Sequence, residues 1–160
     1  MLQFTKSVEY SLIALAALSE KPGLSMSARD LAEQHGMPLS LTSKSLKILA
    51  KAGVLSAHRG AAGGFSLSRD PREVTLGEVV TALEGVPSLT PCCSQGDLAE
   101  CGKTQTCAIR RPVERLNRWV MGSILDMTLA TFLAPDSEGP PLIQIRPRWM
   151  VPSRGDHPWP

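Results

Sequence analysis

Aromatic residues are scarce in this sequence. They make up 4% of the 160 residues, whereas hydrophobic residues of all kinds make up 42%. The core must therefore be aliphatic, built from Leu, Ile, Val and Ala, and such a core favours helices over an aromatic-rich sheet. The length suits one domain with extensions.

Long apolar runs are missing as well. The apolar stretch from Ser11 to Leu18 is too short to cross a bilayer, and the charged residues Lys6 and Glu9 lie just before it. We therefore expect no export signal, no membrane partner and a cytoplasmic location.

The sequence also lacks the motifs of common enzyme sites. No phosphate-binding loop, dinucleotide-binding glycine motif or paired nucleophile and base is recognisable, and the glycine-rich segment 60–64 lies between two short strand-like runs. We therefore predict that the chain is not an enzyme. A strong charge of one sign is absent too, because the formal net charge is only +2. Nucleic-acid binding must be argued from the distribution of charge instead.

Three helices are expected in the N-terminal half. The first covers residues 6–20. Ser27 is a good N-cap for the second, over 28–35, and Gly36 would end it in a left-handed conformation. The third covers 39–52 and has a polar, basic face. Two short helices joined across a glycine turn are typical of a helix-turn-helix.

A β-hairpin is expected directly after these helices. Two alternating runs, 54–59 and 65–68, flank the glycine-rich tip. A hairpin that follows a recognition helix is a wing. Another short helix is predicted over residues 75–84.

The C-terminal half contains four cysteines, all between positions 92 and 107. In a chain without an export signal, such a cluster indicates metal or redox chemistry more than a disulfide framework. A long helix then runs from about Ala108 to Phe132, with an apolar face that predicts a dimer interface, formed by Leu116, Val120, Ile124, Met127 and Leu129.

The fold class predicted is mainly α with a small β-hairpin wing: a winged helix-turn-helix followed by a long C-terminal dimerisation helix. The expected parts are a DNA-binding domain (1–84), a cysteine-rich loop (85–107), a dimerisation helix (108–134) and a proline-rich, mostly disordered tail (135–160).

Several segments, in this order, resemble the family of iron–sulfur cluster regulators and nitric-oxide sensors (IscR/NsrR type). They are Thr5–Tyr10, Gly36–Pro38, Lys51–Leu55, Arg59–Leu67, Thr75–Val80 and Leu125–Leu129. The resemblance covers roughly residues 1–134, and the ordered set is more specific than any one segment.

The resemblance implies a homodimer, crossed through the long helix, that binds a palindromic operator in double-stranded DNA. It further implies an iron–sulfur cluster, [2Fe-2S] or [4Fe-4S], on Cys93, Cys101 and Cys107. Arg110 stands where one branch has a ligating His, so that ligand is excluded here. Glu9 of the partner subunit is the first candidate for the fourth ligand, and His35 is the second.

The third helix is expected to enter the major groove. Its available contacts are Leu39, Ser40, Thr42, Ser43, Lys44 and Lys47, side chains that reach phosphates more readily than they read bases. Arg59, which we place at the base of the wing, can insert into a narrow minor groove, as the resembling family does at this position. His58 beside it can touch a phosphate.

Two other interpretations of the cysteines stay open. Three of them with one more ligand satisfy tetrahedral Zn²⁺, although the gaps are longer than those of zinc fingers. A thiol switch is the other, with a disulfide between Cys92 or Cys93 and Cys101 or Cys107. The alternative function is therefore a cluster-free regulator of the same fold.

Overall fold

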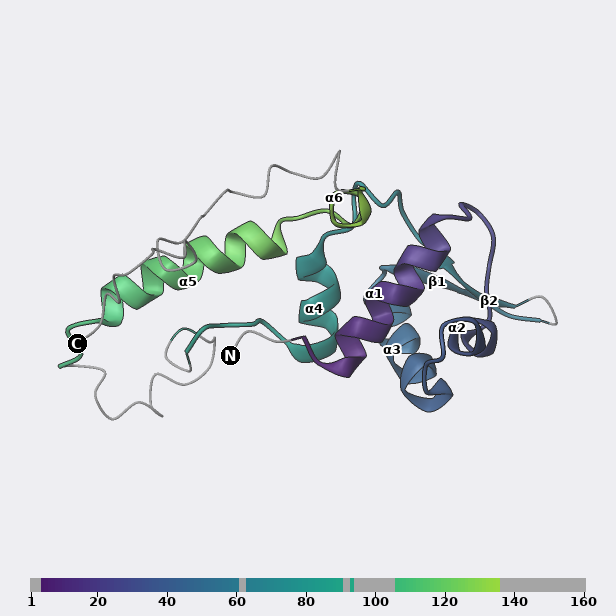
Figure 1. Ribbon diagram of the computed structural model, residues 1–160, viewed down its shortest axis with the longest axis horizontal. Helices are drawn as coiled ribbons and strands as arrows, with labels where there is room; N and C mark the ends of the chain where they lie inside the picture. Colours follow the sequence, from purple (N-terminus) through teal and green to yellow (C-terminus); the bar gives the residue numbers. More distant parts are fainter. Residues whose placement is uncertain (1–3, 61–62, 91–92, 94–105, 136–160) are drawn as a thin grey trace, which may run out of the picture.

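The first helices and the hairpin form one body, and the helix α5 extends away from it (Figure 1). This computed structural model describes residues 4–60, 63–90, 93 and 106–135. Its elements are α1 (Lys6–Ser19), α2 (Ala28–Gln34), α3 (Leu39–Lys51), β1 (Leu55–His58), β2 (Gly64–Leu67), α4 (Leu76–Glu84), α5 (Arg110–Leu125) and α6 (Leu129–Leu133). The predicted tail beyond residue 135, together with Cys92 and Cys101, lies outside the described residues.

The turn between α2 and α3 has the geometry that the sequence predicts. Ser27 accepts a hydrogen bond from the Asp30 backbone N–H at 3.1 Å, and the Asp30 carboxylate accepts one from the Ser27 backbone N–H at 3.4 Å. This reciprocal capping box satisfies two N–H groups that the first turn of α2 would otherwise leave free. Gly36 then takes a φ of 62°, and α3 begins at Leu39. The helix-turn-helix is confirmed.

The wing is a two-stranded antiparallel hairpin that pairs Leu55 with Leu67 and His58 with Gly64. Its second strand is also tied to the chain before α2, because Met26 and Phe65 exchange backbone hydrogen bonds of 3.0 and 2.8 Å. Glycine is required at position 64, since a Cβ there would lie 2.4 Å from the Met26 carbonyl oxygen. The wing therefore has a fixed position beside the helix-turn-helix.

Aliphatic side chains fill the core between α1 and the rest of the body. The contributors from different elements have at most 2% of their surface exposed: Leu15, Leu18, Leu31, Leu46, Leu49, Val54, Val79 and Leu129. The predicted aliphatic core is confirmed for the described residues.

The predicted single helix from 108 to 132 is confirmed only in part, because α5 covers Arg110–Leu125 and the chain leaves the helix after Leu125. Residues 127–129 instead pair with the segment before α4. Leu76 donates its N–H to the Met127 carbonyl at 2.9 Å, and Leu129 donates to the Val74 carbonyl at 2.7 Å. Thr128 is extended, and its hydroxyl caps the short helix α6. We call these two hydrogen bonds and the Leu129 side chain the α5 anchor.

The anchor also removes two residues from the predicted dimer face. Leu129 is fully buried in the core, and Met127 packs against that core. Close by, α5 approaches α4 so tightly that a Cβ at Gly77 would lie 2.9 Å from the Leu125 carbonyl oxygen. The base of α5 is therefore firmly attached to the winged body.

Glu78 links the start of α4 to the end of the wing. Its carboxylate accepts the Thr75 backbone N–H at 2.9 Å and an Arg69 guanidinium N–H at 2.7 Å. Burial by itself raises the pKa of Glu78, but the hydrogen bonds from Arg69 and Thr75 outweigh it and hold the pKa below its usual value. Ionised Glu78 therefore stabilises the fold.

We expect Glu78→Gln, which keeps a capping oxygen but loses the charge, to destabilise the protein at pH 7. The loss should not exceed about 1 kcal/mol, because the pair is partly exposed and screened. A depressed pKa contributes stability above the unfolded-state value and loses it as the pH falls through the folded-state value. Urea unfolding at pH 7 and below pH 4 checks this, with Glu73→Gln as the matched control. An equal deficit at both pH values would contradict the assignment.

Candidate nucleic-acid interface and cysteine site

The exposed face of α3 carries most of the predicted DNA contacts. Ser40, Lys44 and Lys47 are exposed, and Ser43 is half-buried. At 100° per residue, positions 40, 44, 47 and 51 lie on one stripe of the helix. Lys51 is exposed there too. Lys51 is not among the predicted contacts, although its spacing of four residues from Lys47 indicates the same face of the helix.

Thr42 does not belong to this face. Its side chain is 1% exposed, and its hydroxyl donates to the Pro38 carbonyl at 3.0 Å. The hydroxyl is therefore used inside the first turn of α3. The prediction that Thr42 contacts DNA is wrong for this reason.

Arg59 lies at the far end of the wing. The hairpin register ends with the pair His58–Gly64, so Arg59 follows the last paired residue instead of standing at the base. It is exposed. His58 is held within the hairpin by a 2.8 Å hydrogen bond between its Nε2 and the Ser66 hydroxyl. Strand β1, which this hydrogen bond holds in the hairpin, therefore places Arg59 beyond the helix-turn-helix.

Cys93 and Cys107 are free, half-buried thiols, and each lies in a segment that is hydrogen-bonded to α5. Cys107 lies just before the helix, and its carbonyl accepts the Arg110 N–H at 3.3 Å. Cys93 lies four residues after Leu89. The Leu89 backbone N–H donates to Asn117 Oδ1, in the middle of α5, at 2.8 Å. Cys101 lies outside the described residues.

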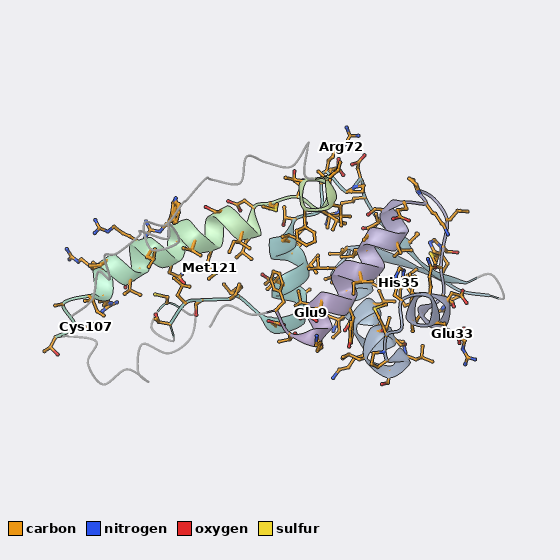
Figure 2. The ribbon with its side chains drawn as sticks, viewed as in Figure 1. Glu9, Glu33, His35, Arg72, Cys107 and Met121 are labelled. Carbon is orange, nitrogen blue, oxygen red and sulfur yellow. The ribbon has the colours of Figure 1, made fainter. Side chains whose placement is uncertain are left out.

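Glu9 and His35 lie far from Cys107 within one chain (Figure 2). Glu9 is on α1, where the Lys6 ammonium donates to its carboxylate. This hydrogen bond, and then the charge of Glu9, raise the pKa of Lys6. His35 caps the C-terminus of α2 in the DNA-binding half. One chain therefore does not bring either candidate to Cys107.

The wing and Cys107 lie at opposite ends of the molecule (Figures 1 and 2). Within a single chain, Cys107 therefore does not neighbour the wing. The physical reason is α5, whose 16 residues separate Cys107 from the anchored end. At 1.5 Å per residue, that helix is about 24 Å long.

The donors present suit a soft metal centre. Thiolates are the preferred ligands of iron–sulfur clusters and of zinc, and neither described cysteine is in a disulfide. Among the described residues, no three His, Cys, Asp or Glu side chains gather into a metal site. A complete site therefore needs donors beyond these two thiols.

A helix-turn-helix with a lysine-bearing second helix and an adjacent wing defines the class of winged-helix DNA-binding proteins. The Rrf2 family of iron-dependent transcriptional regulators matches residues 4–135. The chain belongs to this family and is a transcriptional regulator. The predicted resemblance is thereby confirmed.

Individual relatives align with most of the chain. An Rrf2-like HTH-type transcriptional regulator of Rhodobacter capsulatus is 27% identical over 88% of this chain and 98% of its own length. The transcriptional repressor NsrR of Streptomyces coelicolor is 28% identical over 91% of this chain and 95% of its own length. Among solved structures, CymR, the global cysteine regulator of B. subtilis, superposes with a TM-score of 0.64. It is 25% identical over 83% of this chain and 97% of its own.

These relatives are transcriptional regulators, which is a non-enzymatic role, as predicted. Within the parts of the chain that the structure describes, no helix has the length and apolar character needed to span a membrane.

Proposed function

We propose that this regulator is a homodimer that binds a palindromic operator in double-stranded DNA, with an affinity set by an iron–sulfur cluster. One observation carries the proposal. The Cys107 carbonyl and the backbone N–H of Leu89, four residues before Cys93, both form hydrogen bonds to α5, the helix whose other end is anchored in the winged body. A change at the thiols therefore acts on an element that bears directly on the position of the winged helix.

The proposed DNA contacts are the exposed residues of α3 and the wing. Ser40, Ser43, Lys44, Lys47 and Lys51 contact the major groove and its phosphates. Arg59 enters the neighbouring minor groove, where narrow tracts concentrate negative potential. Since α3 lacks the side chains that make bidentate base contacts, apart from its lysines, groove shape contributes much of the specificity.

The proposed dimer interface is the apolar stripe of α5. Ile109, Leu116 and Trp119 are 64%, 51% and 54% exposed in the single chain. Large apolar side chains exposed together on one helix are typical of an interface that a partner covers. In this proposal residues 1–84 bind DNA, 85–107 carry the cysteines, and α5 is the dimerising part of 108–134, because residues 127–129 are held against the core.

Cys93, Cys101 and Cys107 are the proposed cluster ligands, with the partner subunit's Glu9 as the fourth. The separation of Glu9 from Cys107 in one chain supports a ligand that crosses the dimer. When bound, the cluster supplies a centre that nitric oxide, redox state or iron supply can alter. The chain's own part is to hold three soft thiolates beside a helix that reaches the DNA-binding body.

A cluster-free regulator is the second candidate. Its supporting observation is the likeness to CymR, together with two free thiols that a switch or a zinc ion could use. In that case the same cysteines would form a disulfide or a zinc site.

The DNA contacts predict two different mutant effects. We expect Arg59→Ala to weaken operator binding by about 1–3 kcal/mol at fixed salt, the usual size of one good contact. We expect Lys51→Ala to lower the slope of log affinity against log salt by about 1, because one phosphate contact is lost. Fluorescence anisotropy measures both.

Arg72→Ala is the matched control, since Arg72 is exposed and lies on the far side of the body from α3 (Figure 2). If all three variants bind alike, the proposed surface is not the DNA interface.

The cluster predicts a brown protein after purification without oxygen, with visible absorbance and with bound iron and sulfide. Cys107→Ala should abolish the absorbance, and Glu9→Ala should shift it, while His35→Ala leaves it unchanged. A colourless wild-type protein that contains zinc, or neither metal, would favour the second candidate. A spectrum that Glu9→Ala does not perturb would exclude Glu9 as a ligand.

The proposed dimer predicts that a charged side chain placed in the apolar stripe changes the mass of the sedimenting species. Leu116→Glu should convert the sedimenting species from dimer to monomer, because a carboxylate cannot be buried there without a partner. Arg118→Glu changes an exposed side chain that lies about 160° around α5 from Leu116 and should leave the dimer intact. Dimers of unchanged stability in both variants would place the interface elsewhere.

A further inference from the structure

Asn117 is the α5 side chain that holds the cysteine-bearing segment after α4. Its Oδ1 accepts the Leu89 backbone N–H at 2.8 Å, across 28 positions of sequence, and the contact is partly buried. Asparagine is a weak helix former, so its place inside α5 has to be explained by what its side chain does. The amide oxygen satisfies a backbone donor that no regular element supplies with a partner.

Cys93 is attached to the same segment by a short chain of hydrogen bonds. The Ser88 hydroxyl donates to the Thr90 carbonyl at 3.1 Å, and the Cys93 N–H donates to that carbonyl at 2.9 Å. The Thr90 hydroxyl donates to the Cys93 sulfur at 3.3 Å. Position 93 is therefore fixed relative to Leu89, and Leu89 is fixed relative to α5.

The chain changes direction where it leaves α4. Gly85 ends that helix with a φ of 81°, and Val86 is half exposed. Packing at this end is therefore a weak constraint on where the segment lies along α5. The hydrogen bond to Asn117 supplies a specific one.

We propose that Asn117 is a positioning residue, which sets where the Cys93 thiol lies along α5 and so couples the chemistry of Cys93 to that helix. The inference rests on the proposed function in taking Cys93 as a working thiol. It deepens that function by naming the side chain that joins the thiol to the helix.

The test compares Asn117→Leu with Asn117→Asp in the full-length, reduced, metal-free protein. Leucine has the same branched skeleton of heavy atoms and favours helix, but it cannot accept a hydrogen bond, whereas aspartate keeps the acceptor. The measurement is the rate of alkylation by iodoacetamide at each cysteine, read by tandem mass spectrometry, which separates Cys93 from Cys92. Thermal melting verifies that each variant is folded.

In the leucine variant, we expect Cys93 to react about fivefold faster, the factor that one net hydrogen bond contributes. Cys107 should react at its wild-type rate, and aspartate should restore the wild-type rate at Cys93. An unchanged rate at Cys93, or an equal rise at Cys93 and Cys107, would overturn the proposal. The second result would mean general loosening.

A parallel measurement separates this proposal from the cluster itself. Each variant is incubated anaerobically with ferrous iron and sulfide, and the visible absorbance is recorded. If the wild type forms no chromophore, the cluster proposal fails, while the alkylation rates still decide the role of Asn117. If the wild type forms one, the leucine variant should yield less of it and the aspartate variant should approach the wild-type yield.

Discussion

The α5 anchor is the constraint on which the functional arrangement depends. Two backbone hydrogen bonds join residues 127–129 to 74–76, and the Leu129 side chain is completely buried in the core. Burial of one leucine stabilises by about 1.5–3 kcal/mol. Because this contact fixes one end of α5, it also fixes which way the apolar stripe faces. The opposite end of the helix, beside Cys107, projects away from the winged body (Figure 2).

Local signals in the sequence predicted most of the winged body. The cap at Ser27, the left-handed Gly36 and the alternation in the wing are short-range features, and all of them appear in the structure. The break after Leu125 could not be predicted in the same way. Met127 continues the helical spacing of Leu116, Val120 and Ile124, and only pairing with a segment about 50 positions earlier draws it and Leu129 to the core.

The site was predicted less completely than the fold. Helical spacing selected Ser40, Lys44 and Lys47 correctly as exposed, but residue type alone made Thr42 a DNA contact. Residue type does not reveal that the Thr42 hydroxyl is already bonded to the carbonyl four residues earlier. The tie between Asn117 and Leu89 is equally invisible, because neither residue belongs to a recognisable motif.

Distance within one chain limits how any signal at the cysteines can reach DNA. Cys107 and the wing lie at opposite ends of the molecule, so direct contact between them inside a chain cannot carry the coupling (Figure 2). Two physical routes are left: along α5 to its anchor, or across a dimer to the partner's first helix. The first route runs through α5 and needs only the cysteines, whereas the second needs a donor from the partner. A cluster, a zinc ion and a disulfide would therefore differ in the chemistry of the switch but could all use the route along α5 to its anchor.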